Sequence, residues 1–436
     1  MRSTRHRSLV AATAGACAAM ACLIAVPAAS AAPDAGWTVQ PTPPLPSDIQ
    51  LPPDVPPATG EGSFAGVSCA SADACTAVGQ ESPGDVPAGE LAEVWDGTAW
   101  SVIETDTLDF DFGSKLVSVS CGAPGACIAV GSGQSPNTTA VSQVLTETSA
   151  EGAGAPADFD IAELLSVSCA SISECMAVGN TGDFNQPLII DHLADGAWTS
   201  LNPPLPADSH PSLLSEVSCA AASFCMALGF DADGNTFIET WDGTSWALTP
   251  PPNPPGATSS SLGVVSCPAV GDCVALGSWG NQSGSHLLAE QFRHGAWEQI
   301  SAPPLAADGS EPAIAAIACP ARNVCTVVGS ATDPDPNTGG PTHPYAARLH
   351  HGRWELQAPL DVPGAADDSF ASVSCPTRRA CTAVGQSVGN GTSDVGSLQP
   401  LVEHWVRSGH HHGRRHGDRG RSGRSRERGR TGRRGR

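Results

Sequence analysis

Pairs of cysteines six positions apart recur down the chain, and this repeat restricts the fold more than any other feature of the sequence. The first copy reads "SFAGVSCASADACTAVG", from Ser63 to Gly79. The first cysteines of successive copies lie 48 to 56 residues apart, which is the spacing of repeat units made of one supersecondary element each. The pattern therefore predicts seven similar units in tandem. Their cysteine pairs are Cys69 with Cys75, Cys121 with Cys127, Cys169 with Cys175, Cys219 with Cys225, Cys267 with Cys273, Cys319 with Cys325, and Cys375 with Cys381.

Each unit contains four short β-prone runs. A unit passes through V-S-C, five residues, C-x-A-V-G, a loop of variable length, an apolar run such as "LAEVW", a D-G turn and a tryptophan-containing run. Gly, Pro and Asp-Gly signals separate the runs, as they separate strands, and "WDGTAW", from Trp95 to Trp100, predicts a tight hairpin. Radial packing buries both faces of such four-stranded units and leaves few open edges. The sequence therefore predicts an all-β fold, a seven-bladed β-propeller.

The two ends of the repeat region give an independent argument for a closed ring. The last unit has an outer apolar run, "PLVEHWV" from Pro400 to Val406, but no tryptophan-containing run after it. Such a run, "AGWTVQP" from Ala35 to Pro41, stands before the first cysteine pair. We therefore expect the N-terminal strand to complete the last blade. The second unit lacks the D-G turn and the tryptophan ("LTETSAEGAGAPADF") and is expected to form the weakest blade.

An elongated array of independent disulfide-bonded modules is the alternative architecture. Modules of about 50 residues with one disulfide and few aromatic side chains bury too little apolar surface to fold well alone. The N-terminal strand would also have no partner in such an array. Both points favour the propeller.

The spacing of the cysteines favours disulfides over metal binding or redox chemistry. Structural zinc sites use closer cysteine pairs with further Cys or His ligands, and redox pairs use C-x-x-C, whereas each pair here is C-x5-C. Five intervening residues let the two cysteines face each other on adjacent antiparallel strands. We expect one disulfide per blade, each contributing roughly 2.4 kcal/mol by closing its loop in the unfolded chain.

The chain is expected to consist of three segments. Residues 1–31 have a basic start, an uncharged apolar run from Leu9 to Val26 and small residues up to Ala31, the order of a secretory signal peptide. A retained membrane anchor is the alternative interpretation, and no later segment has the pattern of a membrane span. Residues 32–406 are expected to form the propeller and residues 407–436 a disordered tail rich in Arg, Gly and His. The fourteen cysteines left after cleavage fit a secreted protein, extracellular or cell-wall associated.

Charge is divided sharply between the body and the tail. Residues 32–406 hold seven Lys and Arg against 42 Asp and Glu, whereas residues 407–436 hold twelve Arg against two acids. We expect the tail to contact anionic cell-wall polymers; a solvated polyelectrolyte without a partner and a tail that folds back on the acidic propeller are the alternatives. Export argues against nucleic acid as the natural partner, although arginine-rich tails bind it in vitro.

The repeat resembles that of a family of secreted bacterial β-propeller proteins built on V-S-C-x5-C-x-A-V-G followed by a W-D-G-x-x-W hairpin. The resemblance covers nearly all of the chain from Trp37 to Trp405. More distantly, the D-G-x-x-W turn is similar to the Asp-box hairpin of sialidase-like propellers and to Kelch repeats, but three positions separate Asp96 from Trp100 where the Asp box has four. The resemblance therefore implies the fold and no catalytic residue. Most members of the family have no assigned activity.

The few arginines of the body do not assemble the cluster that a sialidase-type active site needs. Such sites combine an arginine cluster with a tyrosine nucleophile, but Tyr345 is the one tyrosine of the chain. Arg322, Arg378 and Arg379 fall in the cysteine loops, which a propeller places opposite the variable loops. We therefore expect a non-catalytic binding or scaffold protein with an extracellular ligand, a glycan or a protein. A carbohydrate-active enzyme with paired carboxylates is the alternative.

Two acidic loops after the A-V-G strand are candidate calcium sites, since alternating Asp and Asn side chains offer the oxygen ligands that Ca²⁺ prefers. Solvated Asp-Gly turns are the alternative, and neither loop matches an EF-hand. No other cofactor is expected. Because loop length varies after A-V-G, we expect the ligand face there, including Asp231 to Asn235 and Asp333 to Gly340. The candidate calcium ligands are Asp231, Asp233, Asn235, Glu239, Asp333, Asp335 and Asn337.

Overall fold

The computed structural model describes residues 35–45, 60–82, 87–105, 110–153, 162–181, 188–205, 211–231, 234–334, 340–389 and 397–407. The signal peptide expected at residues 1–31 and the tail beyond Arg407 lie outside these ranges, so both stay predictions. The described residues form 28 β-strands and no helix, and thus contain no helical segment that could span a membrane. All of the strands belong to one unit of the chain, Asp34–Arg436.

The strands form seven antiparallel sheets of four, which we number as blades in chain order. Blade 1 consists of β2 (Glu61–Ser71), β3 (Ala74–Ser82), β4 (Gly89–Trp95) and β5 (Trp100–Val102). Blade 2 consists of β6 (Ser114–Ala123), β7 (Ala126–Ser135), β8 (Asn137–Leu145) and β9 (Ala150–Gly152). Blade 3 consists of β10 (Glu163–Ser171), β11 (Glu174–Asn180), β12 (Ile189–Ala194) and β13 (Ala197–Leu201).

The remaining blades repeat the same order of strands. Blade 4 consists of β14 (Pro211–Ala221), β15 (Phe224–Asp231), β16 (Thr236–Trp241) and β17 (Trp246–Thr249). Blade 5 consists of β18 (Ser259–Ala269), β19 (Asp272–Asn281), β20 (Gly284–Arg293) and β21 (Ala296–Gln299). Blade 6 consists of β22 (Ala313–Ala321), β23 (Val324–Thr332), β24 (Thr342–His350) and β25 (Arg353–Leu356). Blade 7 consists of β26 (Ala365–Thr377), β27 (Ala380–Gly389), β28 (Leu398–Arg407) and, from the other end of the chain, β1 (Ala35–Val39).

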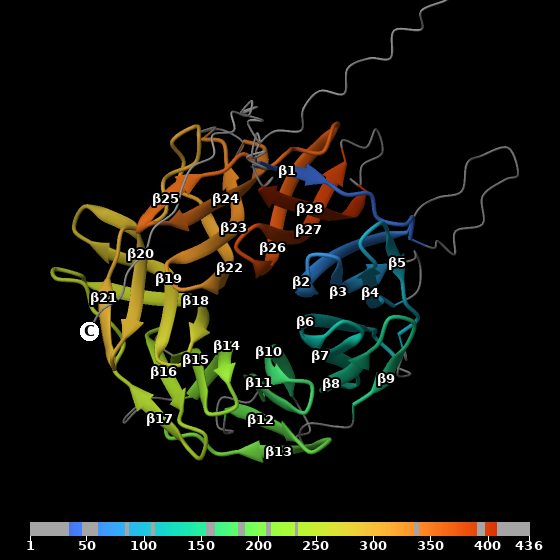
Figure 1. The fold of residues 1–436 in the computed structure, drawn as a ribbon, viewed down its shortest axis with the longest axis horizontal. Coiled ribbons are helices and arrows are strands. Elements are labelled where there is room, and N and C mark those ends of the chain that lie inside the picture. The colour runs from blue at the N-terminus through green and yellow to red at the C-terminus, as the bar shows by residue number, and fades with distance from the viewer. Residues whose placement is uncertain are drawn as a thin grey trace, which may run out of the picture. The chain divides into compact units, whose positions relative to one another are not determined.

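The seven blades stand in a ring, with the first strand of each nearest the centre (Figure 1). The ring is closed by β1, which pairs antiparallel with β28 so that Trp37 lies opposite Trp405. Both tryptophans are buried. The structure therefore confirms the seven-bladed propeller and its closure by the N-terminal strand.

Blade 2 keeps four strands although it lacks the D-G turn. In blade 1 the carboxylate of Asp96 accepts hydrogen bonds from the backbone N–H groups of Thr98 and Ala99. In blade 2 the hydroxyl of Thr146 accepts the bond from the backbone N–H of Ser149 at 3.0 Å. A threonine hydroxyl thus replaces the aspartate as the acceptor that shapes the turn.

The cysteine pairs form the seven expected disulfides, each between the first and second strands of one blade. Their Cα atoms lie 3.9 to 4.1 Å apart. The disulfides therefore fasten the inner hairpin of every blade, as predicted. The bonded pairs are Cys69 with Cys75, Cys121 with Cys127, Cys169 with Cys175, Cys219 with Cys225, Cys267 with Cys273, Cys319 with Cys325, and Cys375 with Cys381.

The glycine of A-V-G is required by an irregularity of the inner strand. Each first strand has a β-bulge against the second, in blade 2 between Leu116 and Ser118. The bulge brings the carbonyl of Lys115 so close to Gly131 that an added Cβ would lie 2.0 Å from the carbonyl oxygen. The corresponding distance is 1.9 or 2.0 Å in six of the seven blades. No side chain fits there, so the motif needs its glycine.

The serine of V-S-C links neighbouring blades. The hydroxyl of Ser68 in blade 1 accepts a hydrogen bond from the backbone N–H of Cys121 in blade 2, at 3.0 Å. The same bond recurs at 2.9 to 3.0 Å in five further pairs of blades. Blade 6 has Ala318 at this position and lacks the hydroxyl. The serines thus satisfy inner-strand N–H groups that would otherwise be buried without a partner.

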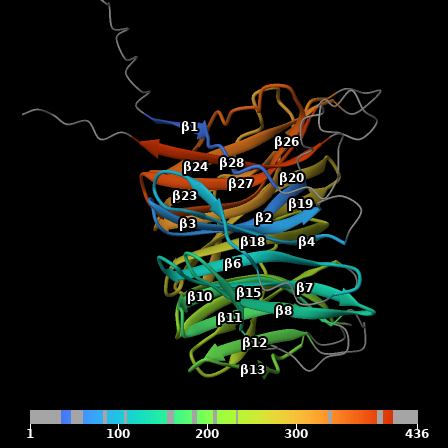
Figure 2. The same ribbon diagram turned by 90° about the vertical axis from the view of Figure 1, so that its right-hand side faces the viewer.

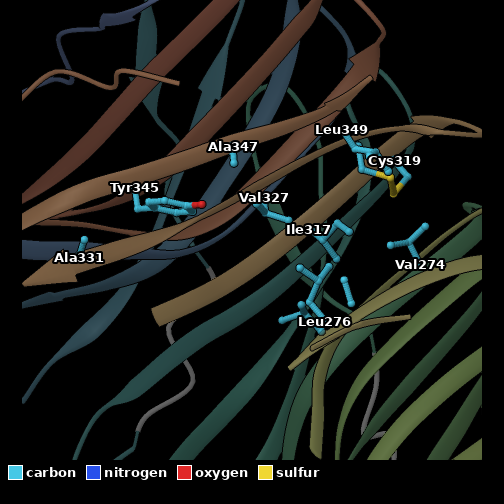
Figure 3. Close-up of a cluster of buried hydrophobic side chains, with 12 residues drawn as sticks. Val274, Leu276, Ile317, Cys319, Val327, Ala331, Tyr345, Ala347 and Leu349 are labelled. Atoms are coloured by element: carbon cyan, nitrogen blue, oxygen red, sulfur yellow. A yellow bond between two sulfur atoms is a disulfide. The ribbon is translucent and has the colours of Figure 1, made fainter. Parts of the chain in front are cut away.

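The apolar core lies between the blades. In the cluster drawn in Figure 3, Val274 and Leu276 from blade 5 pack against Ile317, Val327 and other buried side chains of blade 6. Each blade therefore depends on its neighbours for burial, which is why the units do not need large apolar side chains of their own.

Alternating strand directions give the ring two different faces (Figure 2). One face carries the cysteine loops and the turns between third and fourth strands, and we call it the cysteine-loop face. The opposite face carries the connections from second to third strands and from each blade to the next. We call it the variable-loop face, because these connections differ in length.

Candidate functional site

A pocket opens on the variable-loop face of blade 6. Its rim carries Asp308 from the loop before β22, Asp333 from the loop between β23 and β24, and Asp361 from the loop after β25. His343 stands near the start of β24, between the last two. The cavity measures about 380 Å³, which is within the range of small-ligand sites. We call it the blade 6 pocket.

The floor of the blade 6 pocket is largely apolar, with Ala331, Pro344, Tyr345 and Leu356 among its residues. Figure 3 shows Tyr345 and Ala331 at one end of the core cluster, far from the disulfide end. The Tyr345 hydroxyl donates a hydrogen bond to the carbonyl oxygen of Pro304 at 2.7 Å and so ties the preceding loop to the blade. Tyr345 is only 2% exposed, and burial raises its pKa. It is therefore a structural residue and not an exposed nucleophile.

The rim is held together by a histidine between two carboxylates. His343 Nδ1 lies 2.9 Å from Asp361 Oδ1, and His343 Nε2 lies 3.5 Å from Asp333 Oδ2. The hydrogen bond with Asp361 is the main cause that raises the pKa of His343 above its usual value, although burial opposes it. Hydrogen bonds from the backbone and hydroxyl of Ser310 lower the pKa of Asp308. Three carboxylates against one imidazole leave the rim negative at neutral pH.

Only one residue of this rim was foreseen from the sequence. Asp333 belongs to a variable loop that was expected to face a ligand. Asp308 and Asp361 come from connections between blades, and His343 begins a strand, so no single stretch of sequence contains the group. The fold brings three separate loops together, and spacing along the chain does not reveal that.

The calcium candidates do not converge in the described residues. Both carboxylate oxygens of Asp231 accept hydrogen bonds from Asn235, which closes a tight turn. No group of three or more Asp, Glu, His or Cys suited to a metal ion occurs in the described part of the chain. Asp233, Asp335 and Asn337 lie outside the described residues. The calcium sites therefore stay a prediction.

The second cysteine of each pair is a buried structural residue and takes no part in a ligand site. Cys75 and Cys127 border the cavity between blades 1 and 2, but both are bonded within their own blades. In the other five blades the second cysteine is no more than 1% exposed and lines none of the pockets described here. These cysteines are thus out of reach of a ligand and only stabilise the fold. They are Cys175, Cys225, Cys273, Cys325 and Cys381.

A ring of buried acids, which the sequence pattern did not reveal, runs through the third strands. Each acid lies opposite the alanine of A-V-G, as Glu93 does opposite Ala77. Blade 2 has Gln143 at this position and blade 6 has Ala347. The signal was an acidic residue inside an otherwise apolar run such as "LAEVW". The five acids, each no more than 2% exposed, are Glu93, Asp191, Glu239, Glu290 and Glu403.

Burial raises the pKa of every acid in this ring. It raises the pKa of Glu93, Glu239 and Glu403 to about 8, that of Glu290 to about 7 and that of Asp191 to about 6. Enclosed between blades, these carboxyl groups cannot reach a substrate. Glu239, one of the candidate calcium ligands, belongs to this ring and is fully buried on β16.

Two further cavities are lined by residues of blades 1 and 2, the second also by Glu163 of blade 3. The one on the cysteine-loop face, of about 450 Å³, is lined by cysteine-loop and turn residues such as Trp95 and Glu147. The one on the variable-loop face, of about 260 Å³, contains Lys115 and Glu163, whose side chains form an ion pair at 2.8 Å. The blade 6 pocket is the stronger candidate, because it combines an apolar floor with several charged groups from different loops.

The chain is thus a seven-bladed β-propeller with one disulfide in each blade. No protein-family model and no curated protein matches its sequence. Solved structures similar to it include YCF48 bound to a D1 peptide, at 13% identity over 85% of this chain and 97% of that one, with a TM-score of 0.49. The lectin of Aleuria aurantia in complex with a methyl fucoside is 11% identical over 68% of this chain and 97% of the lectin, with a TM-score of 0.42. The sialidase of Trypanosoma rangeli is 12% identical over 84% of this chain and 59% of the sialidase, also with a TM-score of 0.42. These likenesses concern the fold alone.

Proposed function

We propose that this protein is a secreted, non-catalytic binding propeller that holds its ligand in the blade 6 pocket and is retained at the cell surface by its basic tail. One observation carries the proposal: Asp308, Asp333 and Asp361 converge from three loops over an apolar floor. Loops of variable length on a rigid scaffold are the usual place for binding residues.

The pocket fits a cationic group on an apolar stem. Its carboxylates attract a positive charge and can accept charge-assisted hydrogen bonds, while the apolar floor suits methylene groups. A lysine or arginine side chain of a protein partner combines both features. An amino sugar within a glycan offers the same charge with less apolar surface and is the second choice.

His343 makes the binding of a cation dependent on pH. The protonated imidazole occupies Asp333 and Asp361, and its raised pKa extends this state above the usual range for histidine. Above that pKa the neutral imidazole no longer balances the two carboxylates. The affinity for a cationic ligand is therefore expected to rise with pH through the titration of His343.

Export is supported by two features. Disulfides persist in oxidising compartments, and all fourteen cysteines of the propeller are paired. The pattern of residues 1–31 adds a signal peptide. Retention follows from the twelve arginines of residues 407–436, which complement anionic cell-wall polymers.

A carbohydrate-active enzyme is the alternative function, and the pocket supports it less well. Glycoside hydrolysis needs one carboxyl group kept protonated as a general acid. In the blade 6 pocket the hydrogen bonds of Ser310 lower the pKa of Asp308. Five of the acids with raised pKa values lie in the enclosed ring, out of reach of a substrate. The pKa values of Glu81 and Glu216 are raised as well, but neither residue lines the blade 6 pocket.

A binding array tests the proposed site. The protein, cleaved of its signal peptide, is applied to immobilised glycans and to peptides that contain or lack Lys and Arg. We expect retention by basic peptides or amino-sugar glycans, and its loss when Asp333→Asn and Asp361→Asn are combined. Glu151→Gln, which removes one negative charge from the exposed strand β9, is the control and should bind normally. Equal retention by the double variant would refute the assignment of the pocket.

A further inference from the structure

Basic residues gather on one half of the cysteine-loop face, across blades 5, 6 and 7. Of the eight Lys and Arg residues that the structure describes, Lys115 alone lies on the variable-loop face, near the start of β6. The others come from cysteine loops, from the turns after third strands, and from the ends of β24 and β28. We call them the basic patch, which consists of Arg293, Arg322, Arg348, Arg353, Arg378, Arg379 and Arg407.

The other half of the same face is acidic. The corresponding loops and turns of blades 1 to 4 carry Asp73, Asp96, Glu147, Glu174, Asp195 and Asp242. The body has 42 acids and seven basic residues, so the gathering of the basic residues on one half of one face distinguishes that half from the rest of the surface. The separation therefore points to a role for the positive half.

Few negative charges balance the basic patch. Among the described residues its ion pairs reach a single acid, Asp272, which lies 3.2 Å from Arg293 and 3.1 Å from Arg322. Asp272 is buried, whereas Arg322 is 63% exposed. One carboxylate shared by two guanidinium groups leaves the surface positive.

Like charges meet where blades 6 and 7 join. The guanidinium of Arg348 lies over the ring of Trp405, 3.4 Å from its centre, and donates a hydrogen bond to the carbonyl oxygen of Arg378 at 3.2 Å. Burial lowers the pKa of Arg348 to about 10; the nearby positive charge of Arg407 adds to this shift, and the carboxylate of Glu355 opposes it. The backbone N–H of Arg407 in turn donates to the carbonyl oxygen of Arg379. Several positive groups are thus held side by side by backbone and aromatic contacts.

We propose that the basic patch is a docking surface for a linear polymer with phosphate groups along its length. This inference rests on the proposed retention at the cell surface and assigns part of that retention to the folded ring. The chain leaves the ring at Arg407, within the basic patch, and continues with eleven more arginines. The sequence thus adds further positive charge after the last residue of the patch.

The chemistry favours a phosphate polymer over a single small anion. The exposed charges of the patch are all arginines, whose planar fork matches phosphate oxygens, whereas Arg348 is 7% exposed and supports the others from below. The arginines come from cysteine loops and strand ends of three neighbouring blades, and four of them lie where blades 6 and 7 join. Charges spread in this way suit a ligand with repeated phosphates, which gains from every contact.

The test uses long-chain inorganic polyphosphate as the probe and compares full-length mature proteins. In a tail-neutral protein the eleven arginines beyond Arg407 are replaced by glutamine, so that binding reports on the ring. We expect Arg353→Gln, Arg378→Gln and Arg379→Gln together to weaken its binding about tenfold and to lower the slope of log affinity against log salt by about two. Lys115→Gln is the matched control for the single variant Arg379→Gln, since each removes one positive charge. Lys115→Gln should leave polyphosphate binding unchanged.

Three outcomes separate the possibilities. If the triple variant of the tail-neutral protein binds polyphosphate as its parent does, with an unchanged melting temperature, the inference fails. If the tail substitutions alone release the protein from the wall fraction, the tail accounts for retention at the cell surface. The proposed part of the basic patch in retention then fails. Tighter binding to phosphatidylglycerol vesicles than to polyphosphate would also overturn the proposal, in favour of a membrane surface.

Discussion

The hydroxyl of Ser374 in blade 7 accepts a hydrogen bond from the backbone N–H of Cys69 in blade 1, at 2.9 Å. This bond crosses the closure of the ring between residues 305 positions apart in the chain. At the outer edge of the same blade, β1 pairs with β28. The ring is therefore closed at its inner and its outer circumference.

Ser374→Ala removes the inner bond at the closure. We expect it to lower the free energy of unfolding by about 1 kcal/mol, since it leaves a buried N–H without its acceptor. The reverse change is available in the same molecule, because blade 6 has Ala318 where the other blades have serine. Ala318→Ser should stabilise the ring by a similar amount. Chemical denaturation of both variants checks the pair, and equal stability of the two would contradict this role of the serines.

Gly131→Ala places a methyl group 2.0 Å from the carbonyl oxygen of Lys115. The bulged backbone cannot move aside without loss of pairing between β6 and β7, so we expect a loss of about 3 kcal/mol or more. Gly263 lies in the bulge of blade 5 and has open space around an added Cβ. Gly263→Ala should therefore be tolerated. The melting temperatures of the two variants measure the difference, and comparable losses would show that the bulge is not the cause.

The buried acids predict that the protein loses stability as pH rises. The pKa of each of these acids is higher in the folded protein than in the unfolded chain. The protonated form therefore contributes its full stability below about pH 4.5. This stability is lost as the pH rises through the folded-state pKa, which is about 8 for Glu239. Within this pH range, each buried acid lowers the free energy of unfolding by at most about 1.4 kcal/mol for each pH unit. Glu239→Gln should remove the pH-dependent loss of stability that comes from this one acid, and should therefore stabilise the protein more at pH 8 than at pH 5. Denaturation curves that shift with pH by the same amount in the variant and the natural protein would contradict this account.

Features that repeat along the chain could be predicted from the sequence. The cysteine pairs, the four strands of each blade and the donated strand containing Trp37 depend on local patterns that seven copies reinforce. The functions of individual motif residues were harder to predict than the strands themselves. The serine of V-S-C bonds to the next blade, so its role is visible only once Ser68 and Cys121 are neighbours. The acids of the third strands looked like interruptions of apolar runs.

The candidate site could not be predicted because it is built where the repeat breaks down. Blade 6 has Ala347 in place of the buried acid and Tyr345 below the loops. Its rim residues belong to three loops with no common motif, and their distances along the chain carry no signal. Only the ring geometry brings Asp361 within 2.9 Å of His343.

The most direct test of the central claim is the NMR signal of the His343 imidazole during addition of N-acetyl-arginine methylamide. The signal is assigned by comparison with His343→Gln. If the blade 6 pocket binds a cationic group, the signal will shift with a saturable dependence on the probe, the pKa of His343 will fall, and the effect will vanish when Asp333→Asn and Asp361→Asn are combined. An imidazole signal that stays unchanged up to the solubility limit of the probe would contradict the proposed site.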